Sequence, residues 1–140
     1  MYSVLCMKDN TQTPRHAPIR SFTQLNVWKN GHLLVLHIHR LLKKFPKEQQ
    51  FALANQMSRA SISITSNIAE GFSRLSNKEK TQFYYIAQGS LTELQNQLLI
   101  SRDLSYITSE EFINAAKETV IVHKLLSGLI KYAKNTIPNT

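Results

Sequence analysis

Apolar residues recur at intervals of three and four along most of the chain, which is the spacing of one face of an α-helix. The connections between these stretches are short, so neighbouring helices must run antiparallel. We therefore predict an all-α fold, an antiparallel up-down-up-down four-helix bundle spanning residues 21–134. Residues 1–20 are expected to be a flexible N-terminal tail, and residues 135–140 a C-terminal tail. The pattern predicts helices over residues 24–44, 48–70, 76–103 and 108–134.

Local signals mark where these helices begin and end. Phe45-Pro46 ends the first helix, because the residue before a proline is pushed out of the α region. Gly71 follows the second helix as its expected C-cap. The last two helices open with predicted capping boxes, in which a hydroxyl and a glutamate satisfy each other's free backbone N–H groups. These boxes pair Ser76 with Glu79, and Thr108 with Glu111.

The second predicted helix carries apolar side chains on two faces rather than one. Its core stripe repeats at spacings of three and four, as Leu53, Met57, Ala60, Ile64 and Ile68. A second stripe lies roughly opposite, where a helix facing water should be charged. We interpret this stripe as an oligomer interface, because it suggests burial on both sides of the helix. Its residues are Phe51, Ser58, Ile62 and Ala69.

Antiparallel packing allows residues on neighbouring helices to be paired by their height in the bundle. Equal distances from the turn near residue 74 bring Glu93 close to Arg59, and we predict an ion pair between these two side chains. Equal distances from the turn near residue 47 set Asn67 opposite Trp28. The Asn67 side chain is therefore a candidate hydrogen-bond partner for the indole N–H.

Charge is distributed unevenly along the sequence, which has a formal net charge of +8. Residues 1–80 contain 12 Lys and Arg against four acids, whereas residues 81–140 contain five of each sign. Such an excess favours an anionic partner such as nucleic acid, with simple solubility as the alternative. The single cysteine, Cys6, excludes an intrachain disulfide. We expect a cytoplasmic protein without a secretory signal or membrane association.

Side chains that could carry chemistry are few and scattered. Glu70 and Glu93 are the only acids expected near a buried face, and no Glu precedes a His by three positions, as helical di-metal sites require. We interpret both glutamates as structural polar residues rather than an acid–base pair. His32 and His39 lack a third ligand, and no serine stands in a nucleophile elbow. We therefore expect no catalytic residue, no metal site and no cofactor.

Basic side chains form two candidate nucleic-acid-binding clusters. The first lies on the first helix and its exit, and consists of Lys29, Arg40, Lys43, Lys44 and Lys47. The second surrounds the turn between the second and third helices, at the opposite end from Lys47, and consists of Arg74, Lys78 and Lys80. Tyr84 and Tyr85 are near enough to the second cluster to offer stacking surfaces. Solvated lysines and tyrosines at a bundle rim or subunit contact are the alternative.

Four segments of the sequence carry a family resemblance. They are Ser21-Phe22 with Leu25, Val27 and Trp28; Lys44-Phe45-Pro46-Lys47-Glu48; Ser66-Asn67-Ile68-Ala69-Glu70-Gly71; and Gly89-Ser90-Leu91-Thr92-Glu93-Leu94. In this order they resemble the bacterial family called four-helix bundle protein, first noted in intervening sequences of large-subunit (23S) ribosomal RNA genes. The resemblance covers about residues 21–134. Two positions depart from the family: Thr65 stands where it often has proline, and His39 where it often has an aromatic residue.

This resemblance implies a bundle fold and assembly into a ring-like homopentamer. More distant relatives are accessory proteins of diversity-generating retroelements, in which a basic pentamer binds nucleic acid and a reverse transcriptase. Two functions follow as hypotheses. The first is a non-enzymatic oligomeric bundle that binds RNA or DNA through its basic surface. The alternative is a protein-interaction scaffold, an adaptor for a neighbouring enzyme such as a reverse transcriptase, without direct nucleic-acid binding.

Overall fold

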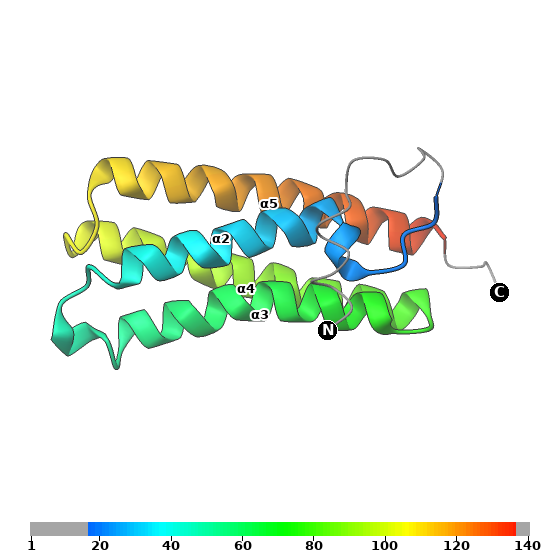
Figure 1. Cartoon of the computed structure of the whole chain (residues 1–140), viewed down its shortest axis with the longest axis horizontal. Coiled ribbons are helices and arrows are strands. Elements are labelled where there is room, and N and C mark those ends of the chain that lie inside the picture. The colour runs from blue at the N-terminus through cyan, green and yellow to red at the C-terminus, as the bar shows by residue number, and fades with distance from the viewer. Residues whose placement is uncertain (1–16, 137–140) are drawn as a thin grey trace.

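The computed structural model describes residues 17–136 of the chain. Figure 1 shows four long helices lying side by side, with successive helices running in opposite directions. These are α2 (Asn26–Leu42), α3 (Leu53–Ser73), α4 (Asn77–Asp103) and α5 (Ser109–Asn135), with short 3-10 helices η1 (Phe22–Gln24) and η2 (Lys47–Gln49). No β-strand occurs between residues 17 and 136. The predicted all-α four-helix bundle is confirmed, whereas most of the predicted tail, residues 1–16, and residues 137–140 lie outside the described residues.

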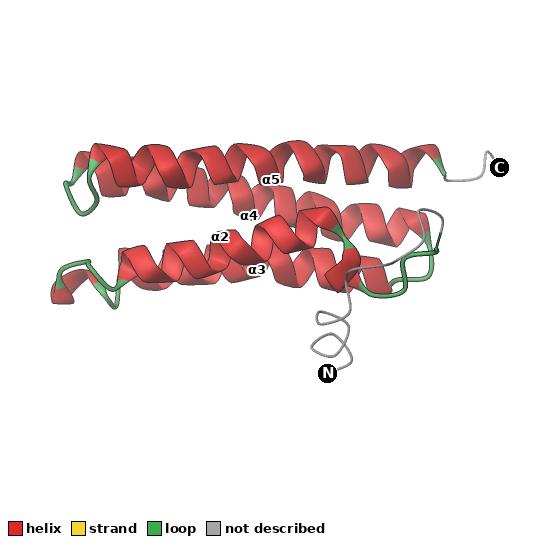
Figure 2. Ribbon diagram, turned by 45° about the horizontal axis from the view of Figure 1, so that its top comes forward, coloured by secondary structure: helices red, strands yellow, loops and turns green. Residues whose placement is uncertain are grey.

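The four helices close into a bundle because α5 returns to pack against α2. Each helix also packs against its neighbours in the sequence, whereas the backbones of the diagonal pairs, α2 with α4 and α3 with α5, do not approach each other closely within the described part of the chain. Figure 2 shows this arrangement. The α2–α3 and α4–α5 connections lie at one end of the bundle, and the α3–α4 turn lies at the other (Figure 1). None of the described helices is long and apolar enough to cross a membrane.

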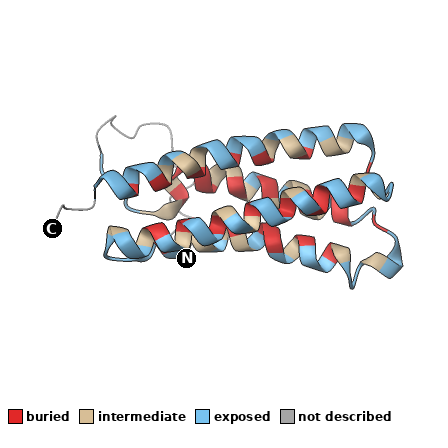
Figure 3. Ribbon diagram, turned by 180° about the vertical axis from the view of Figure 1, so that it is seen from behind, coloured by how far each residue is buried: buried red, intermediate tan, exposed pale blue. Residues whose placement is uncertain are grey.

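One apolar core runs along the inner faces of all four helices, where Figure 3 shows the buried positions. Met57, Ile64 and Ile68 of the predicted stripe on α3 are fully enclosed, which confirms that stripe as core. Tyr84 of α4 is a core residue that the periodicity missed, and only 2% of it is exposed. Its ring forms part of the packing between α3 and α4, because it lies against the backbone of Gly71.

The connection between α2 and α3 is longer than predicted. α2 ends at Leu42 and α3 begins at Leu53, five residues after the expected start. The side chain of Gln50 explains the difference, since its Nε2 donates to the carbonyl oxygens of Leu42 and Phe45 at 3.1 and 3.2 Å. The Leu42 carbonyl also accepts from the Phe45 N–H at 3.1 Å, so Gln50 adds a second bond at the end of α2 and holds the turn against it.

Gly71 is an internal residue of α3 and not its C-cap, so that prediction is wrong. The helix continues to Ser73, and no glycine among residues 17–136 adopts a positive φ angle. The position requires glycine for a steric reason, because a Cβ atom there would lie 2.7 Å from the ring of Tyr84. Lys80 closes the helix end instead, since its Nζ donates to the carbonyl oxygen of Phe72 at 2.5 Å.

The two predicted capping boxes differ in the structure. At the start of α5, Thr108 and Glu111 satisfy each other's backbone N–H groups, which confirms that box. At the start of α4, the Ser76 hydroxyl accepts from the Glu79 N–H at 3.1 Å, but the reciprocal bond is not formed. The N-terminus of α4 is therefore capped by one side chain rather than by two.

The predicted ion pair between Arg59 and Glu93 is not formed. The two helices meet at the expected level, since the hydroxyls of Ser63 and Ser90 hydrogen-bond at 2.8 Å, and Arg59 and Glu93 border one hollow. Both charged side chains are exposed, however, and Glu93 accepts from Gln97 at 3.3 Å instead. An exposed pair gains little in water against the side-chain entropy that it loses.

The predicted hydrogen bond between Asn67 and Trp28 is also not formed. The Asn67 amide is satisfied within α3, where its Nδ2 donates to the carbonyl oxygen and hydroxyl of Ser63 at 2.8 and 3.0 Å. The Trp28 ring instead stacks on His32, with centroids 4.8 Å apart, and meets the ring of Phe22 edge-on at 5.3 Å. Aromatic packing therefore holds the tryptophan.

The second stripe on and before α3 is only partly turned outward. Phe51 is 92% exposed and Ile62 is 45% exposed, so nothing in the described chain covers them. Ala69 is half-buried. Ser58 belongs to the α2–α3 contact, because its hydroxyl hydrogen-bonds to Nε2 of His39 at 2.8 Å. The outward apolar surface of this region is therefore smaller than the sequence predicted.

Candidate nucleic-acid interface

In the folded chain, the excess of positive charge lies in one half of the bundle, which contains residues of all four helices. If each helix is divided at its midpoint, one half of the described bundle carries eight Lys and Arg against two acids, Glu70 and Glu79. The other half carries seven Lys and Arg against six acids. We call the first the basic half; its cations are Arg20, Lys29, Arg74, Lys78, Lys80, Lys124, Lys131 and Lys134.

The other half contains four of the five cations of the first predicted cluster, nearly balanced by acids, whereas Lys29 lies in the basic half. Lys44 pairs with Glu111 of α5, with Nζ and Oε2 2.6 Å apart. The hydrogen bond from Lys44, together with that from the Thr108 backbone, lowers the pKa of the Glu111 carboxyl from its ordinary value. Lys43 and Lys47 are exposed and form no ion pair with any described residue. The same end of the bundle carries three acids at the α4–α5 connection: Asp103, Glu110 and Glu111.

Two cations of the second predicted cluster have structural contacts. Lys80 lies over the ring of Phe72 at 5.2 Å and donates to the carbonyl oxygen of the same residue, and burial lowers the pKa of its amine. The Arg74 guanidinium lies over the ring of Phe83 at 4.6 Å. Lys78 is exposed and forms no ion pair with any described residue. Only Lys78 of this cluster is therefore wholly available to a ligand.

The end of α5 supplies cations that the sequence did not assign to either cluster. Lys131 and Lys134 are exposed at the same end of the bundle as the α3–α4 turn. Lys134 Nζ lies over the ring of Tyr85 at 4.9 Å. Both lysines belong to residues 81–140, a segment with zero net charge. Their place at the same end of the bundle as Lys78 follows from the antiparallel topology and not from the charge of the segment.

The aromatic residues of the basic half differ from prediction as well. Tyr84 is buried and burial raises the pKa of its hydroxyl to about 12, so its ring is not an exposed stacking surface. Tyr85 is 44% exposed, as a stacking residue requires. Tyr132 of α5 is 68% exposed, and sequence reasoning missed it. Its place one residue after Lys131 was the available signal.

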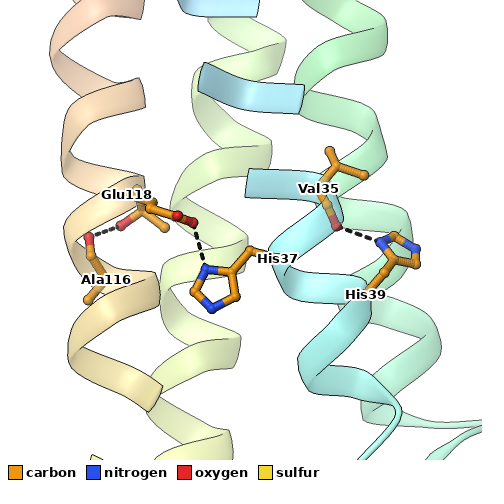
Figure 4. Close-up of polar contacts among 6 residues, drawn as sticks. Val35, His37, His39, Ala116 and Glu118 are labelled. Atoms are coloured by element: carbon orange, nitrogen blue, oxygen red, sulfur yellow. Dashed lines mark hydrogen bonds and ion pairs between the residues drawn. The ribbon is translucent and has the colours of Figure 1, made fainter. Parts of the chain in front are cut away.

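The histidines of α2 form contacts between helices. His37 Nδ1 lies 2.7 Å from Glu118 of α5, and His39 Nδ1 lies 2.8 Å from the carbonyl oxygen of Val35 (Figure 4). The second nitrogen of His39 hydrogen-bonds to the Ser58 hydroxyl, which resembles a nucleophile beside a base. Ser58 lies inside α3, however, where helical hydrogen bonds occupy the amide N–H groups that would form an oxyanion hole. We interpret the pair as a link between α2 and α3.

The described residues contain no group of three or more His, Cys, Asp or Glu side chains placed to hold a metal ion. Glu70, the second acid singled out in the sequence, is exposed and forms no ion pair with another described residue. Cys6 lies outside the described residues.

The model of the 23S rRNA-intervening sequence protein family matches residues 23–128 of the chain. The chain belongs to this family. The 23S rRNA-intervening sequence match includes three of the four motifs in full and most of the first, so the family resemblance is confirmed. None of the curated proteins matches the chain.

A solved structure supports the same fold. It is the crystal structure of a protein of unknown function from the S23 ribosomal protein family of Bacteroides thetaiotaomicron. The two chains are 26% identical and superpose with a TM-score of 0.70, over 75% of this chain and 95% of that chain. This similarity supports the four-helix bundle of the 23S rRNA-intervening sequence protein family. The function of the Bacteroides protein is unknown, so the comparison indicates no activity.

Proposed function

We propose that this chain is a non-enzymatic protein that binds nucleic acid, RNA or DNA, through the basic half of its bundle. The charge asymmetry between the two halves carries the proposal. A phosphate backbone binds where Lys and Arg are concentrated. The basic half carries eight of these side chains and only two acids. Lys78, Lys131 and Lys134 are exposed and free of ion pairs with described residues.

The test reverses these three charges, with Lys78→Glu, Lys131→Glu and Lys134→Glu in one variant. Binding of a labelled oligonucleotide is followed by fluorescence anisotropy at several salt concentrations. The wild type should lose affinity steeply as salt rises, because binding releases counterions from the phosphates. The variant should bind at least about tenfold more weakly, and its slope against salt should be smaller by roughly two to three phosphate contacts.

A matched control changes the net charge equally at the other half of the bundle. Arg40→Glu, Lys43→Glu and Lys47→Glu alter three exposed residues of that other half. This control should retain affinity close to that of the wild type. If both variants lose affinity equally, net charge rather than the basic half determines binding. If both variants bind as tightly as the wild type, the proposal is refuted.

The alternative function, a protein-interaction scaffold or adaptor, is favoured by a different surface. Two hollows on α4 and α5 share Phe112, Ala116 and Val120, and are bordered by aliphatic side chains. Three of these, Leu99, Ile113 and Ile121, are between 41% and 48% exposed. A contiguous apolar surface of this kind is typical of a protein contact. A scaffold would bind a neighbouring enzyme through this surface and show no salt-dependent affinity for nucleic acid.

A further inference from the structure

A cleft opens at the basic half of the bundle, between the segment before η1 and the ends of α3, α4 and α5. Its volume is about 530 Å³, within the range of roughly 300–1,000 Å³ typical of pockets for small ligands. Three aromatic side chains line it: Phe72, Tyr84 and Tyr132. Aliphatic side chains complete the walls, among them Leu25 and Leu129.

Polar groups reach this cleft from one side, on α4. Lys80 lines it and uses one N–H to donate to the Phe72 carbonyl, so two donors of its ammonium group are left. Asn77 also lines the cleft, and its Nδ2 donates to Thr136, while no described residue donates to its side-chain oxygen. Flat apolar walls with a few donors and acceptors at one edge suit a planar heterocycle.

Four exposed cations are direct sequence neighbours of residues that line the cleft: Arg20, Lys78, Lys131 and Lys134. A ligand whose flat apolar part enters the cleft would therefore have its anionic groups at the end of the bundle that carries these positive charges. An unpaired nucleobase, with phosphates on both sides of its sugar, has this distribution of flat surface and charge.

We propose that the cleft takes an unpaired nucleobase, so that the basic half prefers single-stranded over double-stranded nucleic acid. The exposed ring of Tyr132 stacks on the base, Asn77 and Lys80 meet its polar edge, and the surrounding lysines contact the adjacent phosphates. A duplex keeps its bases stacked inside and reaches only the cations. This inference rests on the proposed function and adds to it the form of nucleic acid that is bound.

The experiment compares one labelled oligonucleotide as a single strand and as a duplex, using fluorescence anisotropy on the full chain. The wild type should bind the single strand more tightly. Tyr132→Ala should weaken single-strand binding by at least about fivefold and leave duplex binding nearly unchanged, because it removes one stacking surface. Tyr132 is 68% exposed, so the substitution removes little core packing.

Two further variants separate stacking from other effects. Tyr132→Phe keeps the ring and should retain the preference for the single strand. Leu75→Ala removes a fully exposed apolar side chain from the same half of the bundle, but Leu75 does not line the cleft. The Leu75 variant should therefore also keep that preference.

The outcomes distinguish this inference from the function on which it rests. If the wild type binds both forms equally, or Tyr132→Ala weakens both equally, the basic half binds nucleic acid but the cleft takes no base. If neither form binds, the proposed function fails as well. Decanoate, an apolar carboxylate that also fits the lining, serves as a competing probe. Binding of decanoate that a single strand does not displace would overturn the inference.

Discussion

At the scale of single residues, the contact between Gly71 and Tyr84 determines how closely α3 and α4 approach. The buried tyrosine ring occupies the space that a side chain at position 71 would need. Close-packed interiors cannot absorb an added carbon without moving a neighbour. The Tyr84 ring is enclosed, and the added carbon would also lie 3.0 Å from Cβ of Phe83, so the two neighbours cannot move aside at low cost.

Gly71→Ala should therefore destabilise the protein by about 1–3 kcal/mol, the usual cost of overpacking. The free energy of unfolding can be measured by urea titration followed by circular dichroism. Gly89→Ala is the matched control, because a Cβ atom at position 89 of α4 meets nothing within 4 Å. That control should gain roughly 0.5–1 kcal/mol of helix stability. A gain in both variants would contradict the steric account.

The sequence predicted a glycine-dependent feature at Gly71 but assigned the wrong cause. A glycine after an apolar stripe is typical of a C-cap, and nothing in the local pattern indicates a ring from the next helix. The same reasoning missed the hydrogen bond from Lys80 to the end of α3. A lysine near a helix start looks like an ordinary surface lysine until α3 and α4 are placed side by side. Both errors concern contacts across a turn rather than within one helix.

At the scale of elements, α4 ends in a Schellman motif built around a residue other than glycine. Ser105 has a φ of 61°, and its N–H donates to the carbonyl of Arg102, while the Tyr106 N–H donates to that of Ser101. The left-handed conformation is unfavourable for a residue with a Cβ atom. The α4–α5 connection therefore contains a local conformational cost.

Ser105→Gly should stabilise the protein by roughly 0.5–1 kcal/mol, because glycine adopts this conformation without a steric cost but loses more entropy on folding. Thermal unfolding of the variant and the wild type is the measurement. Ser105→Ala keeps the Cβ atom and should give no gain. If glycine and alanine both lower the midpoint, the serine hydroxyl rather than the backbone conformation would be the important feature.

All four helices could be predicted from the sequence, because each has a long apolar stripe and three of the four show a clear start or stop signal. The connection between α2 and α3 could not. Gln50 reaches back to the carbonyl oxygens of Leu42 and Phe45, and a glutamine among polar residues gives no sign of that role. The existence of a helix follows from periodicity, whereas this boundary accompanies two side-chain hydrogen bonds that periodicity does not reveal.

At the scale of the whole molecule, apolar side chains outside the core favour assembly with other copies of the chain. Ile62 lies on the outer part of α3 and is 45% exposed, and Phe51 before this helix is 92% exposed. We propose that this surface is part of a homo-oligomer interface, in line with the ring-like pentamer that the family resemblance implies. Exposed groups of apolar side chains are typical of such interfaces.

Ile62→Glu should therefore reduce the assembly to monomers, because it places an unpaired charge in the interface. Light scattering coupled to size-exclusion chromatography measures the mass directly. Asn96→Glu, an exposed substitution on α4, is the control and should leave the mass unchanged. An oligomer of unchanged mass in the Ile62 variant would place the interface elsewhere on the bundle.

The candidate site was only half predictable at this scale. The antiparallel topology alone predicts that Arg40, Lys43, Lys44 and Lys47 lie at the opposite end from Arg74, Lys78 and Lys80, whereas Lys29 of the first cluster lies in the basic half. The sequence did not show that acids at the α4–α5 connection would offset the charge of the first cluster, or that Lys131 and Lys134 would lie at the same end as the second. Net charge summed along a chain hides such pairings, because residues far apart in sequence share one end of a bundle.

The unequal charge of the two halves also has a consequence for motion in solution. The dipoles of antiparallel helices oppose each other, so the side chains alone set the electrical direction of this rod-shaped molecule. Near a polyanion it experiences a torque that turns its long axis toward the phosphates, within a screening length of about 10 Å at 0.1 M salt. Under the proposed function, encounters with nucleic acid therefore occur end-on, which leaves the long flanks of the helices open to other copies of the chain.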